Sequence, residues 1–410
     1  MRQNSDTRIS LNDVYQPEYA DDPYRLYRQL REIDPVFWDE ELDSWVLTGY
    51  AEVVASLRDA RFSAQRFVTD QEWMPPEMVE ALGAPMRALT RQMLFLDPPD
   101  HTRLRGLVSK AFTPRVIEGL RSRIQQVVDE LIDKALAKGH IKFIEEFAYP
   151  LPAIVIAEML GVPVEDREIF FKWTNDFGTI LEGADLTQEE MVQAFQGVSE
   201  FMEYFRQIVA RRRTQPKDDL IQAMITAEEG GSMLSEEELL GNCILLLAAG
   251  HGTTTHLLGN GTLALLRHPE QYQMLKERPE LLQLGVMELL RYDGPVQVTA
   301  RKAMTELTIR DKKIEAGQKV LISLGGASHD PAQFAEPDRL DVQRVENRHM
   351  AFGHGIHYCL GAPLARLEAE IAFGTLLRRL PNPRVENEEE VKFFSGMVFR
   401  GLNELPLALG

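Results

Sequence analysis

Apolar residues recur every three or four positions along most of this chain, a spacing that places them on one face of an α-helix. Over shorter stretches, apolar and polar residues alternate between turn residues, which predicts β-strands. The predicted helices are an amphipathic one from about 22 to 33 and longer ones over roughly 114–138, 187–213 and 235–267. The predicted strands are a hairpin at 37–38 and 45–47, and a group within 296–325.

Prolines interrupt the regular patterns in two further segments, and one of these segments also contains a glycine. Segment 70–95 carries three prolines and one glycine, and we expect an irregular loop that covers a cavity. Segment 331–347 begins with a proline and carries a second one at 337, so we expect it to be extended. Together these patterns predict a mainly α-helical protein with small β-sheets.

Composition narrows the class of protein. Hydrophobic residues make up 44% of the 410 positions, which is enough for a large core, and no linker, repeat or low-complexity tract divides the chain. A net charge of −18 argues against nucleic acid or acidic membranes as partners. The two cysteines, Cys243 and Cys359, cannot form a disulfide framework.

No targeting segment is evident. The N-terminal residues MRQNSDTRISLNDVY lack the apolar region of a secretory signal, and no uninterrupted apolar run approaches a membrane span. The most apolar stretch, CILLLAAG, is too short to cross a bilayer and is followed by His251 and a run of threonines. We expect a buried core helix there, and a cytoplasmic protein without a membrane anchor.

Cys359 lies in a sequence context that is typical of a metal ligand. In FGHGIHYCLGAPLAR, Cys359 follows a glycine-rich loop and precedes a helical pattern, and Gly353 and Gly355 allow the backbone to turn tightly beside a flat group. A helix N-terminus favours the thiolate form of a cysteine. Because no second Cys or His stands at zinc spacing, a single axial ligand of haem iron fits better than structural zinc. The alternative is a small buried apolar cysteine.

These residues resemble the haem-binding signature of the cytochromes P450, Phe-Gly-x-Gly-x-x-x-Cys-x-Gly. The chain matches each fixed position of that signature, namely Phe352, Gly353, Gly355, Cys359 and Gly361. The resemblance extends over nearly the whole chain and implies one P450 domain over 1–410, mainly α with small β-sheets. It also implies haem b (iron protoporphyrin IX), Cys359 as the iron ligand, and the soluble bacterial branch of the family, since microsomal relatives carry an N-terminal anchor.

The resemblance also assigns the residues that bind the haem propionates. In DPPDHTRLR, His101 and Arg105 lie four residues apart on one helix face, after Asp100 as the expected N-cap. On composition alone, a solvated helix face is the simpler interpretation. In the family this His-x-x-x-Arg pair binds propionates through charge-assisted hydrogen bonds. Arg301 and His357 match further propionate contacts.

Glu288 and Arg291 lie three residues apart in a helical pattern and can interact. An isolated pair of this kind is normally an ordinary surface pair. In the family it joins an Arg or His of the following loop, here Arg344, in a structural triad that fixes the loop carrying Cys359.

The segment LLLAAGHGTTTH is a poor helix interior, because each glycine costs roughly 1 kcal/mol and threonine hydroxyls can bond back to the backbone. It is either a tolerated kink or an opening for dioxygen and water. The family pattern Ala/Gly-Gly-x-Asp/Glu-Thr is matched by Gly250 and Thr253, but Gly252 replaces the acid, which affects proton delivery. His256 shares a face with Thr253 and titrates near neutrality, so it is the candidate auxiliary relay; the alternative is a histidine packed away from the haem. His251 is expected to point elsewhere.

Alignment with the family predicts that the substrate pocket is lined by segment 70–95, by the helix that contains LLLAAGHGTTTH, and by residues 296–299 and 396–399. A mostly apolar lining suits a lipophilic substrate, although each residue taken singly could be plain core. The candidate lining residues are Met86, Leu94, Leu245, Ala249, Val296, Val298, Met397 and Val398.

The predicted function is a haem-thiolate monooxygenase that hydroxylates or epoxidises a polyketide or macrolide, a terpenoid, a steroid or a fatty acid. Electrons would come from a separate ferredoxin or flavodoxin and its reductase, because no flavin or iron–sulfur module is fused to the chain. We expect a monomer. Two alternatives stand beside this one: a peroxide-driven haem-thiolate enzyme, which Gly252 suggests, and a haem-thiolate sensor without turnover, against which Thr253 and the apolar lining argue.

Overall fold

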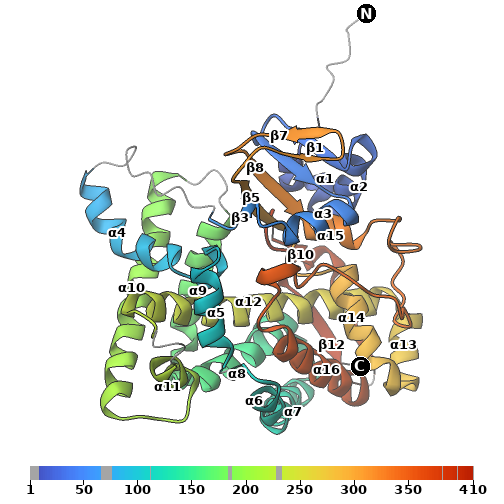
Figure 1. Ribbon diagram of the computed structural model, residues 1–410. Coiled ribbons are helices and arrows are strands. Elements are labelled where there is room, and N and C mark those ends of the chain that lie inside the picture. The colour runs from blue at the N-terminus through green and yellow to red at the C-terminus, as the bar shows by residue number, and fades with distance from the viewer. Residues whose placement is uncertain are drawn as a thin grey trace, which may run out of the picture.

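The computed structural model describes residues 9–65, 76–110, 112–182, 187–227, 233–380, 382–394 and 396–409. Most of them lie in a helical body, with a smaller β-rich part beside the first helices (Figure 1). The α-helices are α1 (Pro17–Ala20), α2 (Pro23–Ile33), α3 (Tyr50–Arg58), α4 (Pro76–Thr90), α5 (Asp100–Ser109), α6 (Pro114–Gly119), α7 (Arg121–Lys138), α8 (Pro150–Leu160), α9 (Arg167–Glu182), α10 (Gln188–Thr214), α11 (Leu220–Thr226), α12 (Glu236–Arg267), α13 (Pro269–Glu277), α14 (Leu282–Tyr292), α15 (Leu324–Ser328) and α16 (Ala362–Arg379).

The strands form small sheets. In the largest sheet the order is β1-β2-β8-β5-β3; β2 and β8 are parallel, and the other neighbours are antiparallel. The remaining pairings are β10-β11, β4-β12-β9 and β6-β7. The strands are β1 (Val36–Asp39), β2 (Ser44–Leu47), β3 (Phe62–Ser63), β4 (His140–Lys142), β5 (Val298–Ala303), β6 (Leu307–Ile309), β7 (Lys312–Ile314), β8 (Lys319–Ser323), β9 (Pro383–Val385), β10 (Lys392–Phe393), β11 (Leu402–Glu404) and β12 (Pro406–Leu409).

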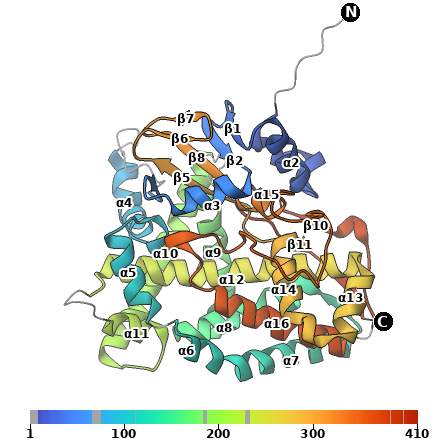
Figure 2. The ribbon, with the colours of Figure 1, turned by 45° about the vertical axis from the view of Figure 1, so that its right-hand side comes forward.

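Helix α12 runs through the middle of the helical body (Figure 2). Its start is fixed by a capping box, in which the Ser235 hydroxyl accepts from the Glu238 N–H while the Glu238 carboxylate accepts from the Ser235 N–H at 2.8 Å. Helices α8, α9, α10 and α16 pack against it, so it is apolar on nearly every side. Helix α16 follows the loop that carries Cys359, and it packs against α12. This packing fixes the position of the cysteine loop relative to α12.

Several predicted elements are confirmed. Helix α2 covers Pro23–Ile33, and the predicted hairpin pairs Trp38 with Trp45 across β1 and β2. The predicted long helices correspond to α10 and α12, and to α6 followed directly by α7. The periodic patterns are long in these regions, and the caps agree with them.

Two local predictions are wrong. Within segment 70–95, residues 76–90 form α4 with Pro85 inside it, while residues 70–75 lie outside the described residues. Pro85 removes one backbone donor, but α4 packs against α10 and α12, and Ala88 and Leu89 are buried in the large core cluster, which holds the helix. Asp100 is the first residue of α5 rather than its N-cap, a place that Pro99 takes. Its charge therefore complements the helix dipole instead of capping an N–H.

Apolar side chains of the described residues gather in a large cluster around α12 and in two smaller clusters that involve the sheet and the N-terminal helices. None of the described helices combines the length and the apolarity that crossing a bilayer requires.

Candidate active site

The loop that carries Cys359 is shaped by its backbone. The Cys359 N–H donates to the Phe352 carbonyl at 2.9 Å, which closes the loop on itself. Gly355 has φ +73°, and a Cβ at this position would lie 2.3 Å from the Leu57 carbonyl oxygen. Only glycine therefore allows the loop to pack directly against α3. Gly353 also lies in the left-handed region, at φ +66°.

The thiol of Cys359 opens on a large internal cavity. Burial raises the pKa of this thiol, and the Gly361 N–H and the Arg105 guanidinium offset only part of that effect. The backbone amides at the start of α16 thus favour the thiolate, as expected, but desolvation is the larger effect. A bound metal ion would supply the missing stabilisation. Among the described residues, no group of three or more His, Cys, Asp or Glu side chains is placed to hold a metal ion.

Two histidine rings and two guanidinium groups lie near Cys359. The rings of His101 and His357 are 4.2 Å apart, and neither ring nitrogen of His101 has a hydrogen-bond partner among the described residues. Arg105 donates to the Tyr358 carbonyl at 2.5 Å. Arg301 on β5 donates to the adjacent Ala300 carbonyl at 2.8 Å. Arg105, Arg301 and His357 line the cavity, and His101 lies directly behind them, beside His357 and close to both guanidinium charges.

This group of residues has the properties of an anion site. Burial lowers the pKa of Arg301 to about 10, and the Asp97 charge opposes only part of that change. Burial, with help from the Arg105 charge, also lowers the pKa of His101. Burying the Arg301 charge costs free energy, and so does burying the His101 ring nitrogens without hydrogen-bond partners. Carboxylates entering from the cavity would satisfy both, so the residues present fit a haem with its propionates here and its iron at Cys359.

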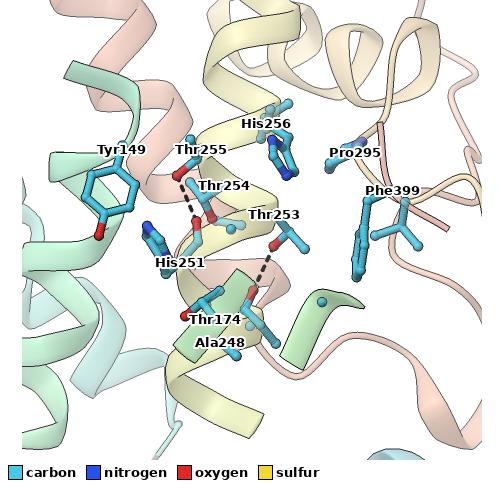
Figure 3. Close-up of a pocket in the computed structure, with 18 of the residues that line it drawn as sticks. Tyr149, Thr174, Ala248, His251, Thr253, Thr254, Thr255, His256, Pro295 and Phe399 are labelled. Atoms are coloured by element: carbon cyan, nitrogen blue, oxygen red, sulfur yellow. Dashed lines mark hydrogen bonds between the residues drawn. The ribbon is translucent and has the colours of Figure 1, made fainter. Parts of the chain in front are cut away.

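On the other side of the cavity, α12 remains a continuous helix through its glycines and threonines. The Thr253 hydroxyl donates to the Ala249 carbonyl at 2.8 Å, and the Thr255 hydroxyl donates to the His251 carbonyl at 3.0 Å (Figure 3). These bonds to the preceding turn still leave the Thr253 oxygen able to accept a hydrogen bond.

The two glycines of α12 have different surroundings. A Cβ at Gly250 would lie 3.2 Å from Ile156 of α8, so this position is packed tightly. A Cβ at Gly252 would meet only the Thr174 methyl group, at 3.9 Å. The Thr174 hydroxyl is buried and has no hydrogen-bond partner among the described residues. Packing therefore does not exclude a larger residue at 252, and the polar wall beside it suits a water molecule.

The two histidines of this segment point in different directions. Figure 3 shows His256 on the same side of α12 as Thr253, whereas His251 points toward Tyr149, with the rings 4.4 Å apart. This arrangement was predicted from the helical spacing. Burial lowers the pKa of His256 to about 4 and that of His251 to about 3. The expectation that His256 titrates near neutrality is therefore wrong, because its ring is buried, with the tilted ring of Phe394 at 4.9 Å.

The cavity has a volume of about 1380 Å³. Two predicted lining residues are not among those that line it. Met397 packs into the apolar cluster of the N-terminal helices, and Met86 packs against the large core cluster. The sequence placed their segments correctly but not the directions of their side chains. The predicted residues that do line the cavity are Leu94, Leu245, Ala249, Val296, Val298 and Val398.

Sequence reasoning missed the contribution of α8 and α9. These helices carry no motif, and a helical repeat of aromatic residues predicts a buried face without saying whether core or cavity lies beyond it. The acidic residue Glu182, at the end of α9, was also missed. The residues of α8 and α9 that line the cavity include Ile154, Ile156, Phe171, Thr174, Phe177, Leu181 and Glu182.

The predicted contact between Arg344 and Glu288 is present. Glu288 and Arg291 are completely buried and joined at 2.8 Å, and Arg344 donates to Glu288 at 3.1 and 3.2 Å. Arg291 also donates to the Pro337 carbonyl at 2.7 Å. The Asn347 amide adds a bond to Glu288 at 3.0 Å. These bonds tie α14 to the extended segment that leads into the cysteine loop.

Comparison with known proteins agrees with this geometry. Residues 52–399 match the family model described as Cytochrome P450. The chain is a cytochrome P450. The match includes the cysteine loop, both propionate-side arginines and the distal helix of this P450.

Relatives of this P450 are found in bacteria. It is 40% identical to the polyketide biosynthesis cytochrome P450 PksS of Bacillus subtilis, over 96% of this chain and 97% of the relative. It is also 40% identical to the cytochrome P450 monooxygenase PikC of Streptomyces venezuelae, over 95% of this chain and 92% of the relative. A crystal structure of P450BioI with a fatty-acyl-ligated acyl carrier protein matches at a TM-score of 0.89 and 36% identity, covering 96% of this chain and 99% of that one. This P450 is a haem-thiolate monooxygenase of the bacterial type.

Proposed function

We propose that this P450 hydroxylates or epoxidises a lipophilic small molecule held in the cavity between Cys359 and α12. The observation that carries the proposal is the cavity itself, which is large, mostly apolar and open to the Cys359 thiol. A site of this kind binds by apolar contact and leaves orientation to a few polar groups. Polyketides or macrolides, terpenoids, steroids and fatty acids are the substrate classes that fit.

The named relatives are consistent with these substrate classes and do not single out one of them. The PksS relative is named for polyketide biosynthesis, and the P450BioI structure holds a carrier protein with a hexadecenoic acyl group. Both substrate types present long apolar surfaces. A polyketide or fatty-acyl chain is therefore the first class to test.

We assign the cofactor as haem b. Bound at Cys359, it would supply the activation of dioxygen. His101, Arg105, Arg301 and His357 would hold its propionates. Thr253 would hold a water by hydrogen bonding, and the apolar wall would limit the access of other water. Electrons would come from a separate ferredoxin or flavodoxin with its reductase. The monomeric state and the cytoplasmic location stay predictions.

One observation favours a second candidate, a peroxide-driven enzyme. The open position at Gly252 lacks the acid that other members of the family carry. Without that acid, proton delivery during reductive oxygen activation is weaker, whereas hydrogen peroxide brings its own protons.

The test first screens lipophilic compounds for those that shift the ferric haem from low to high spin. A compound that does so is then incubated with NADPH, a surrogate ferredoxin and its reductase under labelled dioxygen. The proposal expects NADPH consumption that depends on the compound, and one labelled oxygen atom in the product. Product formation with hydrogen peroxide alone, and none with the reductase system, would support the second candidate and overturn the first.

A further inference from the structure

The last residue of α9, Glu182, makes an unusual set of contacts. Its carboxylate accepts three backbone N–H bonds, from Met397 at 2.9 Å, Val398 at 3.0 Å and Phe399 at 2.9 Å. A helix C-terminus carries partial negative charge, so a carboxylate is unfavourable there unless other groups compensate it. The three amides provide that compensation. They come from a segment more than 200 residues away in the chain.

The opposite edge of this C-terminal segment is bonded to a different wall of the cavity. The Gln297 N–H donates to the Val398 carbonyl at 2.8 Å, and Val296 and Phe399 form an isolated β-bridge. Val296, Val298, Val398 and Phe399 all line the cavity. The segment therefore lies between β5 and α9, and Glu182 is its attachment to α9.

The side chains of the segment do not all point in the same direction. Met397 packs into the cluster of the N-terminal helices, whereas Val398 and Phe399 face the cavity. Figure 3 shows Phe399 facing Thr253 from across the cavity. A shift of this segment would therefore move an aromatic ring at the distal side of the site.

Only a carboxylate satisfies these contacts fully. The primary amide of glutamine has one oxygen and an NH₂ group, so it would place donors opposite donors. Gly396 makes the approach close, because a Cβ there would lie 2.7 Å from the Glu182 oxygen. Burial raises the pKa of Glu182, and the bonds from Val398, Phe399 and Met397 oppose that rise.

We propose that Glu182 is a positioning residue that fastens α9 to residues 397–399, and that this attachment keeps large ligands in the cavity and fixes their orientation. The inference deepens the proposed function, since it concerns the same cavity. Loss of the attachment would let α9 and the C-terminal segment separate, and a ligand that contacts both would leave faster. A ligand too small to reach them would be unaffected.

The test uses Glu182→Gln and Glu182→Ala, with Glu168→Gln as the matched control. Glu168 is on the same helix and also lines the cavity, but it is exposed. Amide hydrogen exchange of residues 397–399 is measured in the haem-loaded protein. The release of clotrimazole and of imidazole from the ferric haem is followed by absorbance. Both compounds bind iron through nitrogen, and only clotrimazole carries bulky aromatic groups that extend from the iron toward the cavity walls. Haem content and circular dichroism establish that each variant is folded.

In both Glu182 variants, amide exchange at 397–399 and release of clotrimazole should each accelerate by about tenfold or more, the effect of losing about 1.4 kcal/mol of hydrogen bonding. Imidazole release and the Glu168→Gln protein should stay within about twofold of the parent. Faster exchange with unchanged clotrimazole release would overturn the proposal, because Glu182 would then be structural only. Unchanged exchange, or equal acceleration for both azoles, would also overturn it. None of these measurements requires turnover, so their outcome is separate from that of the monooxygenase test.

Discussion

Gly252 stands where the family carries a carboxylate, and the structure leaves that position open toward Thr174. Thr253 can hold a water molecule but cannot be the ultimate proton source. We therefore expect Gly252→Glu to raise the fraction of reducing equivalents recovered as hydroxylated product rather than peroxide, by about twofold or more. NADPH, product and peroxide measured in one reaction give this fraction.

We expect His256 to compensate in part for the missing acid, because it lies on the same side of α12 as Thr253. Because burial lowers its pKa to about 4, it would act as a neutral imidazole that passes a proton on, not as a resident cation. His256→Ala should lower the coupled fraction in the parent far more than in the Gly252→Glu background. His251→Ala is the matched control, since that ring points toward Tyr149. Equal coupling in the parent, both single variants and the double variant would show that neither position governs proton delivery.

At the scale of single residues, the sequence predicted which residues belong to the site better than it predicted how buried those residues are. Cys359 and the four propionate-side residues were located from their motifs, because fixed spacing there reflects fixed chemistry. The pKa values of Cys359 and His256 could not be predicted, because burial, which only the fold reveals, outweighs local sequence. Met397 was placed in the pocket, but its side chain faces the opposite side of its segment from Val398.

Among the structural elements, the extended segment before the cysteine loop depends on α14 for its position. Glu288 is completely buried and binds two arginines and one asparagine. Glu288→Gln should therefore reduce the free energy of unfolding by about 3–5 kcal/mol, because it leaves buried guanidinium groups without their anion. It should also speed loss of haem.

Chemical denaturation and haem transfer to apomyoglobin measure these two effects. Glu336→Gln is the control, because Glu336 pairs with Arg339 on the surface, at 3.1 Å. That change should cost less than about 1 kcal/mol. A Glu288→Gln protein as stable as the control would contradict the assigned structural role.

The elements themselves were predictable where the pattern was long. Helices α10 and α12 have capping boxes that agree with their apolar periodicity, and the hairpin of β1 and β2 has regular pairing. Helix α4 was missed because its proline and glycine suggest a loop, whereas its packing against α10 and α12 stabilises the helix.

For the whole molecule, buried neutral histidines predict sensitivity to acid. His251 and His349 have pKa values lowered to about 3, and His256 to about 4. Below about pH 6.5 the histidine rings of the unfolded chain bind protons, whereas the same rings stay neutral in the folded chain. Stability should therefore fall as the pH drops from about 6.5 toward 4. Each histidine contributes up to about 1.4 kcal/mol per pH unit. Unfolding in urea between pH 7 and pH 4.5 measures this slope.

His256→Gln should flatten that slope, whereas the same change at His140, which is exposed, should not. A parent protein whose stability is constant between pH 7 and pH 4.5 would contradict the assignment of neutral buried rings.

The redox partner is expected to bind the face nearest Cys359 through local basic residues. Helix α5 approaches this face, since Arg105 bonds to the Tyr358 carbonyl. Arg103 of α5 is engaged in an ion pair with Glu238, so we do not expect it to contact the partner. Lys110, which follows α5, and Arg115 on α6 have exposed side chains, and we expect these two residues to contact the partner.

Reduction by a surrogate ferredoxin should slow as salt rises, and Lys110→Gln with Arg115→Gln should slow it by about threefold or more at low salt. Stopped-flow reduction measures this, with Lys313→Gln on β7 as the control. Rates that respond neither to salt nor to the double change would remove the docking proposal.

The central claim is that Cys359 ligates haem iron, and the carbon monoxide complex of the reduced protein tests it most directly. The parent and a Cys243→Ala control, which lacks the other cysteine of the chain, should both show the red-shifted Soret band of thiolate ligation. Cys359→His should retain part of the haem and lose that band together with monooxygenase activity. A histidine-type spectrum in the parent, or a thiolate band that survives in Cys359→His, would contradict the account.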